Sequence, residues 1–273
     1  LVNNCIAFTS VRVKLKNVVQ EPLAVKPDNV NARAILVKKL GSSQSILKVS
    51  ADRRWPIASL TKLMTAVVAL EKFSLEQKIY FDDKIIATEG ISGDFRSGES
   101  FTVADLIKAL MLVSSNDAAT ALAEAYGSTS SPQGGSISSP QGGYKNFVDA
   151  MQIKASELGM GQTTFFDPSG LSFLNQSTIE DLEKLVNYVY KNHPQVFEFS
   201  RLSSMLIGGG RTLVNINQFA ENQEFLGGKT GYTDDANGNL ISLFKDQGTG
   251  QPLLIIVLGT QDRFSETQKL LDY

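Results

Sequence analysis

The sequence has almost no histidine and almost no cysteine. Among its 273 residues these two types occur once each, as His193 and Cys5. A single cysteine forms no internal disulfide, and no histidine or cysteine group has metal-ligand spacing. A Ser-His-Asp triad would have to use His193, which precedes Pro194 at an expected helix exit. The sequence also lacks the Gly-x-Ser-x-Gly motif that often carries the serine of such a triad. We interpret His193 as a surface residue and expect neither a metal nor a cofactor.

The chain also lacks an excess of charge and any long apolar run. Its formal net charge is -2 with lysine and arginine scattered, which gives no footprint for nucleic acid. No apolar run reaches the roughly 18 residues that cross a bilayer. The first residue is Leu1 rather than methionine, which implies that upstream residues were removed; the sequence leaves open whether a signal peptide or an anchor was among them.

Apolar residues alternate near both ends of the chain and recur at spacings of three and four between them. The expected strands cover residues 11–15, 34–37, 45–49, 239–244 and 253–258, and the expected helices cover 57–73, a segment after Thr102, 117–126, 144–158, 178–191 and 265–271. This order predicts an α/β (α+β) fold, in which one antiparallel sheet is built from both chain ends and a helical block lies between them.

The chain divides into an extension, a main domain and an insertion. We expect residues 1–30 to form an N-terminal extension with a first strand, and residues 31–273 to form the main domain, with a helical subdomain over about 75–200. Within residues 128–143 the sequence Ser-Ser-Pro-Gln-Gly-Gly occurs twice, with little apolar surface to pack. This composition predicts a flexible surface insertion.

A serine and a lysine stand three residues apart at the start of the helix expected over residues 57–73. Ser59 and Lys62 follow Pro56, so both lie in the first turns and on one face. A serine hydroxyl needs an adjacent base, and a lysine is a base only when its pKa falls. A helix N-terminus and a semi-buried cleft both disfavour the ammonium form. The pair predicts a serine nucleophile with a lysine base.

Two further elements lie downstream in the chain. Ser114 and Asn116 supply a hydroxyl and an amide on a turn between helices, and Lys229-Thr230-Gly231 lies beside an expected strand. In this order, Ser-x-x-Lys, Ser-x-Asn and Lys-Thr-Gly match the set found in penicillin-binding proteins and serine β-lactamases. Each element alone is weak evidence, since Lys-Thr-Gly alone is typical of a turn and Ser-Ser-Asn of a helix cap.

Longer stretches strengthen the likeness. The chain resembles the low-molecular-mass penicillin-binding proteins that are serine-type D-alanyl-D-alanine carboxypeptidases, from residue 31 to the C-terminus and most clearly at residues 58–65, 112–119, 157–160, 167–171 and 228–233. The resemblance implies a β-lactamase/transpeptidase-like fold, and an enzyme that removes the terminal D-alanine from peptidoglycan stem peptides and binds penicillin.

The resemblance also assigns roles to five residues. It implies that Ser59 attacks the carbonyl of the penultimate D-alanine with Lys62 as base, forming an acyl-enzyme that water hydrolyses. Ser114 would relay a proton to the leaving amine with help from Lys229. Asn116 would orient Lys62 and the substrate amide. These are the expected catalytic residues.

The remaining expected site residues bind the substrate. The oxyanion hole would consist of the backbone N–H groups of Ser59 and Tyr232. Thr230 and Lys229 would receive the terminal carboxylate, and Gly231 would let the substrate lie against the strand edge. Thr233 completes the substrate-binding set, which is Thr230, Gly231, Tyr232 and Thr233.

Other features are interpreted as structural. Glu183 imitates the glutamate of a class A β-lactamase, but its place in the sequence favours a salt-bridging helix residue. The Asp-Pro-Ser-Gly sequence at residues 167–170 predicts a turn, and Arg211 a surface residue. A DD-endopeptidase and a serine β-lactamase remain alternative functions. A non-catalytic peptidoglycan-binding domain is disfavoured because every motif position holds a competent residue.

The implied substrate also implies a location. Peptidoglycan stem peptides lie outside the cytoplasm, so we expect an extracytoplasmic enzyme of the cell envelope, associated with the membrane through a segment absent from this chain. The expected partners are the stem peptide and β-lactam antibiotics, which would act as covalent inhibitors.

Overall fold

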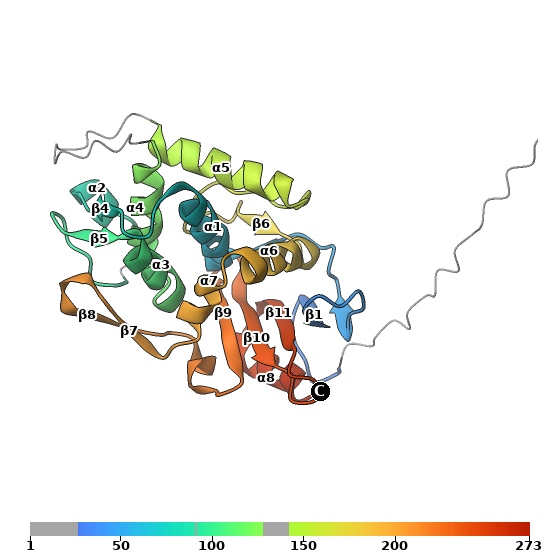
Figure 1. Cartoon of the computed structure of the whole chain (residues 1–273). Helices are drawn as coiled ribbons and strands as arrows, with labels where there is room; N and C mark the ends of the chain where they lie inside the picture. Colours follow the sequence, from blue (N-terminus) through green and yellow to red (C-terminus); the bar gives the residue numbers. More distant parts are fainter. Residues whose placement is uncertain (1–26, 91, 128–141) are drawn as a thin grey trace, which may run out of the picture.

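A five-stranded antiparallel sheet forms the base of the molecule. The computed structural model describes residues 27–90, 92–127 and 142–273. The strands lie in the order β2-β1-β11-β10-β9 and span Ala34–Lys39 (β1), Leu47–Val49 (β2), Phe225–Thr233 (β9), Asn237–Lys245 (β10) and Pro252–Thr260 (β11). At its centre β1 pairs with β11, so the two ends of the chain meet in one sheet (Figure 1). The predicted sheet is confirmed, whereas the strand expected at 11–15 lies outside the described residues.

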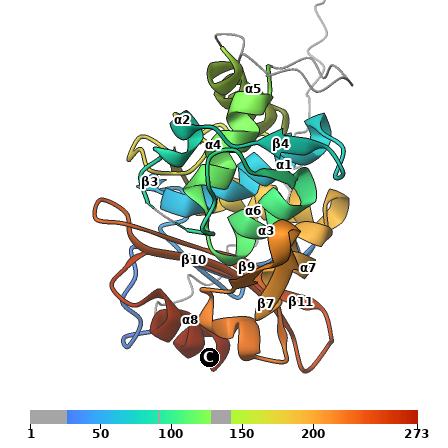
Figure 2. The ribbon, with the colours of Figure 1, turned by 90° about the vertical axis from the view of Figure 1, so that its left-hand side faces the viewer.

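Both faces of this sheet are covered. Along β1, Ala34 and Leu36 pack into the larger apolar cluster with the helices, whereas Ile35 and Val37 pack into a second cluster with Leu270 of α8. Alternate residues of a strand point to opposite faces, so strands buried on both sides are continuously apolar. Figure 2 shows α8 on one side of the sheet and the other helices on the opposite side.

The helical region lies between the two halves of the sheet in the sequence. Its helices span Lys62–Lys72 (α1), Asp83–Ile86 (α2), Val103–Leu112 (α3), Asn116–Ala125 (α4), Gly143–Glu157 (α5), Ile179–Asn192 (α6) and Gln195–Ser200 (α7), and α8 spans Arg263–Leu271. The longer helices agree with the predicted ones to within a few residues. The repeat within 128–143 lies outside the described residues except for its last two glycines, the second of which begins α5.

Short elements complete this region. Three two-stranded pairs join β3 with β6, β4 with β5 and β7 with β8. These strands span Trp55–Pro56 (β3), Lys78–Tyr80 (β4), Ser100–Thr102 (β5), Gln176–Ser177 (β6), Ser204–Ile207 (β7) and Arg211–Val214 (β8), and 3₁₀ turns cover Ala58–Thr61 (η1), Gly208–Gly210 (η2) and Gln218–Glu221 (η3). These pairs could not be predicted from sequence periodicity, because each strand has only two to four residues, too few for an alternating pattern to be recognised.

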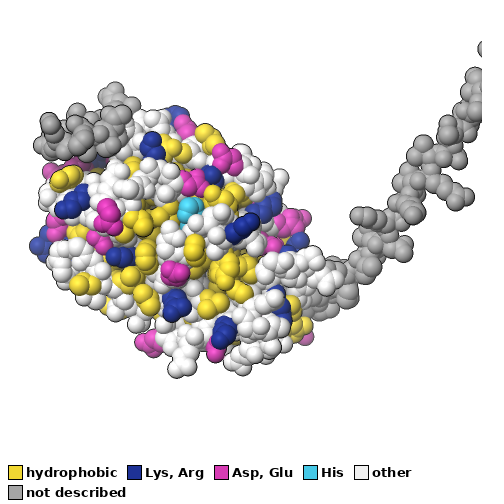
Figure 3. All heavy atoms as spheres, in the orientation of Figure 1, with side chains coloured by type: hydrophobic (Ala, Val, Ile, Leu, Met, Phe, Trp, Pro, Cys, Tyr) yellow, Lys and Arg dark blue, Asp and Glu magenta, His cyan; other side chains and the backbone are white. Residues whose placement is uncertain are grey.

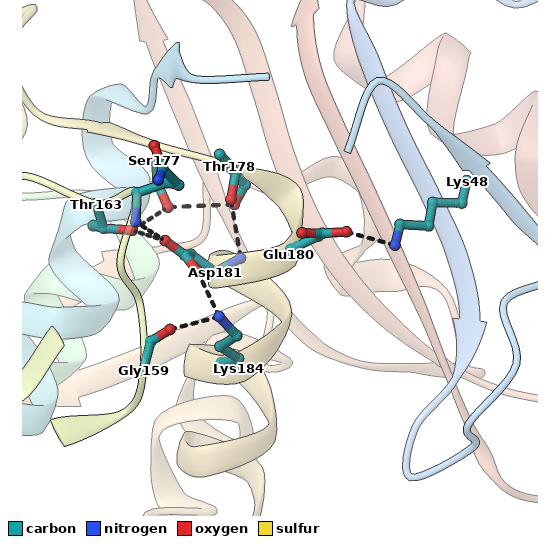
Figure 4. A network of polar contacts seen from close by, with 9 residues as sticks. Lys48, Gly159, Thr163, Ser177, Thr178, Glu180, Asp181 and Lys184 are labelled. Carbon is teal, nitrogen blue, oxygen red and sulfur yellow. Dashed lines mark hydrogen bonds and ion pairs between the residues drawn. The ribbon is translucent and has the colours of Figure 1, made fainter. Parts of the chain in front are cut away.

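Side-chain caps set where the helices begin. Thr178 accepts a hydrogen bond from the N–H of Asp181 at the start of α6, which satisfies a donor that has no partner within the helix. The carboxylate of Asp181 then accepts from Thr163 and Lys184, and Glu180 of the same turn pairs with Lys48 of β2 (Figure 4). This network ties α6 both to the preceding loop and to the sheet.

Charged side chains of both signs lie on the surface. On the face drawn in Figure 3, positive and negative side chains are interspersed and neither sign dominates. Among the described residues, no helix has the length and apolar character needed to cross a bilayer.

Candidate active site

The predicted nucleophile lies on a 3₁₀ turn that leads directly into α1. Ser59 is the second residue of η1 and is half-buried. The preceding residue, Ala58, has φ of 47°, a left-handed conformation that costs about 1–2 kcal/mol for a residue with a Cβ. The next helical turn brings Nζ of Lys62 to 3.0 Å from Oγ of Ser59. The expected spacing of one turn between the two residues is therefore found.

Lys62 is fully buried and is surrounded by three oxygen atoms. Its Nζ lies 2.7 Å from Oδ1 of Asn116 and 2.7 Å from the carbonyl oxygen of Ser169, in addition to Ser59 Oγ. Burial lowers the pKa of Lys62 to about 7, an effect that the negative charge of Asp167 opposes. A neutral amine has two hydrogens and one lone pair. Two acceptors that cannot donate take both hydrogens, which leaves the lone pair for the hydroxyl of Ser59.

The turn between α3 and α4 supplies the second expected element. Oδ1 of Asn116 faces Lys62, and its Nδ2 donates to the carbonyl oxygen of Glu89 at 2.7 Å, which fixes the orientation of the amide. Ser114 has φ of 56°, whereas the next residue, Ser115, caps α4 through the N–H of Ala118. The hydroxyl of Ser114 is therefore not used as the cap of α4.

The third element lies on β9, which is an edge strand of the sheet. Lys229 is 1% exposed, and its Nζ donates to Oγ of Ser114 at 2.9 Å and to the carbonyl oxygen of Thr230 at 2.8 Å. Burial holds the pKa of Lys229 well below its usual value, and the positive charges of Lys62 and Arg263 lower it further. The structure thus brings together all five predicted catalytic residues.

Two glycines pack against the backbone of the nucleophile turn. A Cβ on Gly231 would lie 2.9 Å from the carbonyl oxygen of Ile57 and 3.2 Å from the amide nitrogen of Ser59, and one on Gly170 would lie 1.9 Å from the carbonyl oxygen of Ala58. The sequence interpretation held that Gly231 makes room for substrate. The structure adds a second reason for a glycine here, because η1 packs directly against this position.

The rest of the predicted substrate-binding set lies along β9. Thr230 is buried, Tyr232 is exposed and Thr233 is half-buried. The hydroxyl of Tyr232 donates to Asp234 at 3.2 Å, so this side chain lies at the end of the β9–β10 hairpin where the turn connects the two strands.

The loop at residues 167–172 belongs to the site, although its sequence indicated only a turn. The carboxylate of Asp167 accepts hydrogen bonds from the backbone N–H groups of Ser169, Gly170 and Ser172. This arrangement aims the carbonyl oxygen of Ser169 at Lys62. The turn was predictable from its composition, but its contact with Lys62 spans more than a hundred residues of sequence and was not.

Sequence reasoning missed Arg263, the first residue of α8. Its side chain is half-buried, its Nε has no hydrogen-bond partner, and its charge lowers the pKa of Lys229. It lies beside the start of β10, where a Cβ on Gly238 would be 3.3 Å from Cβ of Arg263. The only signal in the sequence was a cation next to a helix cap, which is a common arrangement.

Three residues interpreted as structural have structural contacts. Glu183 pairs with Lys38 at 2.8 Å, as a salt-bridging helix residue should. Arg211 is less exposed than expected, because it pairs with Glu99 and stacks on two phenylalanine rings. His193 is also half-buried rather than fully exposed and lies beside Tyr188 at the end of α6. The described part of the chain contains no cluster of acidic, histidine or cysteine residues suited to a metal ion.

Comparison with known proteins agrees with this geometry. The family model for peptidase S11, D-alanyl-D-alanine carboxypeptidase, matches residues 21–262. The D-alanyl-D-alanine endopeptidase of Escherichia coli is 29% identical over 259 residues, which is 90% of this chain and 78% of that protein. A D-alanyl-D-alanine carboxypeptidase structure from Mycobacterium tuberculosis has a TM-score of 0.77 and 25% identity, with 94% of each chain covered.

A structure of a penicillin-binding protein is also similar. Penicillin-binding protein D2 of Listeria monocytogenes, in an ampicillin-bound form, has a TM-score of 0.76 and 28% identity, and the match covers 90% of this chain and 98% of that one. Fold, catalytic geometry and family model agree, and the chain belongs to the peptidase S11 family of D-alanyl-D-alanine carboxypeptidases.

Proposed function

We propose that this chain removes the terminal D-alanine of a stem peptide through an acyl-enzyme on Ser59. The observation that carries the proposal is the buried amine of Lys62, which lies 3.0 Å from Ser59 Oγ and has two carbonyl-type oxygens as its other partners. This arrangement supports a neutral lysine that acts as the general base at neutral pH.

Acylation begins with proton transfer from Ser59 to Lys62. The serine oxygen attacks the carbonyl carbon of the penultimate D-alanine, and the negative charge that develops on the carbonyl oxygen is held by the backbone N–H groups of Ser59 and Tyr232. Ser59 lies in the first turn of η1, where N–H groups have no partner within the helix. Such donors contribute about 3–4 kcal/mol to transition-state binding.

The leaving amine then takes a proton. Oγ of Ser114 lies 2.9 Å from Nζ of Lys229, so we assign the delivery of this proton to Ser114, held in place by Lys229. The proton that Lys62 took from Ser59 replaces the one that Ser114 gives up, so Lys62 is neutral again and Lys229 is unchanged. The C–N bond breaks, D-alanine departs, and water attacks the acyl-enzyme with Lys62 again as base. Asn116 serves as a positioning residue for Lys62, because its amide N–H already donates to Glu89.

The terminal carboxylate of the substrate gives specificity for the chain end. We assign it to Lys229, Thr230 and Arg263, because these positions combine a buried cation, a hydroxyl and a guanidinium whose Nε lacks a partner. Pairing with an anion offsets the cost of burying these groups. Binding of the carboxylate also raises the pKa of Lys229, because it adds a negative charge beside the ammonium.

The family gives the biological setting. Its members act on the D-alanyl-D-alanine end of peptidoglycan peptides, and the ampicillin-bound relative from Listeria supports β-lactams as ligands of this site. We therefore place the enzyme in the cell envelope, with an acyl-enzyme as the form in which a β-lactam inhibits it. Membrane attachment through a segment outside this chain is part of the proposal.

Intact-mass spectrometry after incubation with benzylpenicillin tests the nucleophile. The wild type should gain the mass of one penicillin, and Ser59→Ala should gain none. Ser156→Ala, which changes a serine on an exposed turn of α5, should react like the wild type. An adduct that persists in Ser59→Ala would refute the mechanism.

A DD-endopeptidase remains the second candidate, and a similar Escherichia coli protein bears that name. The two activities differ only in the leaving group. Rates of D-alanine release from a pentapeptide and of cleavage of a cross-linked peptide dimer, measured on the same enzyme, separate them. A β-lactamase is less favoured because Glu183 pairs with Lys38. Sustained nitrocefin turnover without D-alanine release would reverse that order.

A further inference from the structure

The side-chain amide of Asn116 has two ends of nearly the same shape, and its orientation decides what Lys62 can do. Oδ1 accepts from Nζ of Lys62 at 2.7 Å, and Nδ2 donates to the carbonyl oxygen of Glu89 at 2.7 Å. The two ends of an amide differ in hydrogen bonding, because one end only accepts and the other only donates. The partner on the far side, the carbonyl of Glu89, therefore determines which end faces Lys62.

The reversed orientation of this amide would disable the base. Nδ2 would then face Nζ of Lys62 and donate to its lone pair, and the amine would point a hydrogen at Oγ of Ser59 instead of accepting the serine proton. Oδ1 would at the same time face the carbonyl oxygen of Glu89, which leaves two acceptors without a donor between them. The carbonyl of Glu89 thus favours the orientation in which the lone pair of Lys62 is available.

The segment that carries this carbonyl is attached to α4 at two places. Glu89 follows α2, and Oγ1 of Thr88 donates to the carbonyl oxygen of Ile85 at 2.7 Å and is hydrogen-bonded to Oγ1 of Thr120 at 3.1 Å. Asn116 and Thr120 are four residues apart on α4, so they lie on one face of that helix. The bond from Thr120 to Thr88 therefore supports the bond from Asn116 to Glu89, one helical turn away.

Gly90 lies directly beside the bond between Asn116 and Glu89. Its φ is 84°, and a Cβ on this residue would lie 2.8 Å from Nδ2 of Asn116. Gly98 has almost the same backbone conformation, with φ of 86°, but a Cβ there would have no atom within 4 Å. Both positions favour glycine for the backbone alone. Only at Gly90 does the missing side chain also leave room for the amide of Asn116.

We propose that Glu89 and Gly90 are positioning residues for the general base, and that they hold Asn116 in the orientation that leaves the lone pair of Lys62 to Ser59. The inference rests on the proposed function, because it assumes that Lys62 takes the proton of Ser59. It extends the catalytic apparatus to a backbone carbonyl and to the space beside a glycine, neither of which belongs to the three sequence motifs of the site.

The first experiment adds a methyl group at each of the two glycines. Gly90→Ala and Gly98→Ala force alanine into nearly the same φ, so both variants should lose some stability to heat. Gly90→Ala alone should also slow acylation by benzylpenicillin and D-alanine release from the tripeptide Nα,Nε-diacetyl-L-Lys-D-Ala-D-Ala. The expected loss is about 10–100-fold, as for a catalytic group that is misplaced by about 1 Å. Equal rates in the two variants would overturn the proposal.

The pH profile separates a positioning role from general damage to the fold. Oδ1 of Asn116 stabilises the ammonium form of Lys62, so displacing this acceptor should lower the pKa of Lys62. The acid limb of the acylation rate in Gly90→Ala should therefore move to lower pH by about one unit, while the maximum rate falls. Asp167 and Lys229, whose charges interact with that of Lys62, are unchanged in this variant. A lower rate with an unmoved acid limb would overturn the proposal.

A double-mutant cycle shows whether Gly90 acts through the amide. On the background of Asn116→Ala the amide is absent, so Gly90→Ala should lower the remaining rate by less than about twofold. The same loss on both backgrounds would contradict the proposal. Thr88→Val keeps the glycine and removes the bond to Thr120, so its acid limb should move in the same direction by a smaller amount. This variant decides the matter where Gly90→Ala yields no folded protein, and an unmoved limb would again be contrary evidence.

The same measurements separate this inference from the proposed function. If benzylpenicillin does not acylate Ser59 of the wild type, the proposed function and the positioning role fail together. If Ser59 of the wild type is acylated and Gly90→Ala matches Gly98→Ala in both rate and acid limb, only the positioning role fails.

Discussion

The helical half and the sheet half of the site each present one buried lysine, and the two lysines have different surroundings. Lys62, at the start of α1, lies between Ser59 and two oxygens that can only accept hydrogen bonds. Lys229, on the edge strand β9, contacts one hydroxyl and one backbone carbonyl, and it lies close enough to two other cations for them to lower its pKa.

Burial lowers the pKa of both lysines, so burial alone does not distinguish their roles. The neighbours do. Two oxygens accept the two hydrogens of the neutral amine of Lys62, so its lone pair is left to accept a proton from Ser59. In the part of the chain that the structure describes, Lys229 has no carboxylate among its hydrogen-bond partners and lies close enough to Arg263 for that charge to lower its pKa, so an anion can bind beside it. A buried lysine can therefore serve as a base or as a binding group for a carboxylate, depending on the hydrogen-bond acceptors and the charges around it.

The largest effects should come from variants that remove the amine of either lysine. Lys62→Met should lower the rate of acylation by benzylpenicillin about 10³-fold, because general-base catalysis is lost. Lys229→Met should lower the same rate less, by about 10–100-fold, and should raise KM for the peptide. Stopped-flow acylation and D-alanine release measure both effects. Equal losses in the two variants would mean that the lysines do not have separate roles.

Arg263→Gln should weaken the recognition of the carboxylate. Loss of one charge-assisted contact corresponds to about 10–100-fold in kcat/KM, with the change mainly in KM. Steady-state kinetics on the diacetylated tripeptide measure it. Arg53→Gln is the control, because Arg53 lies over the ring of Trp55 rather than beside Lys229. An effect on kcat alone would instead place Arg263 in the chemical step.

The pH dependence should follow Lys62. Its pKa of about 7 means that the amine is protonated below this pH and cannot accept the proton of Ser59. The value of kcat/KM should therefore rise about tenfold per unit of pH up to about 7, and should fall again at higher pH, where Lys229 loses its proton. Binding of the carboxylate should weaken as pH rises, because it needs the ammonium form of Lys229. The acid limb should persist in Lys229→Met, and its loss there would assign the limb to Lys229.

The smallest effect should come from the backbone that presents the nucleophile. Ala58 has φ of 47°, and Ala58→Gly removes its steric cost. Because glycine also makes the unfolded chain more flexible, the net gain should be no more than about 1 kcal/mol in the free energy of unfolding. Urea denaturation measures it, with Ala66→Gly inside α1 as a control that should lose about 1 kcal/mol. A loss in both variants would show that the turn is unstrained.

The sequence allowed the helical half to be predicted in more detail than the sheet half. Ser59 and Lys62 are three residues apart, so helical geometry alone places them on one face. Ser114, Asn116 and Lys229 could be connected with them only through the resemblance to a known family. Their actual contacts cross from one element to another and depend on how the helices pack on β9.

Contacts between distant segments explain the rest. No local sequence pattern links Arg263 to Lys229, because the two residues are far apart in the chain. The contact of the Ser169 carbonyl with Lys62 involves a backbone atom, which any residue type would supply. The packing of Gly231 against η1 was not predictable either, since the close approach of η1 to β9 is a property of the folded chain. Sequence periodicity predicts elements more reliably than the contacts between them.

The pairing of β1 with β11 also determines the order in which the site can assemble. Residues 34–39 find their partners at residues 253–258, more than two hundred positions later. The central pair therefore closes a very long loop, which makes folding slow compared with a local topology. Ser59 and Lys62 precede β9 and Arg263 by more than 160 residues, so these substrate-binding groups join them only after most of the chain has been made. A partly synthesised chain would hold the nucleophile without the groups that bind the substrate, so its reactivity would appear only at the end of folding.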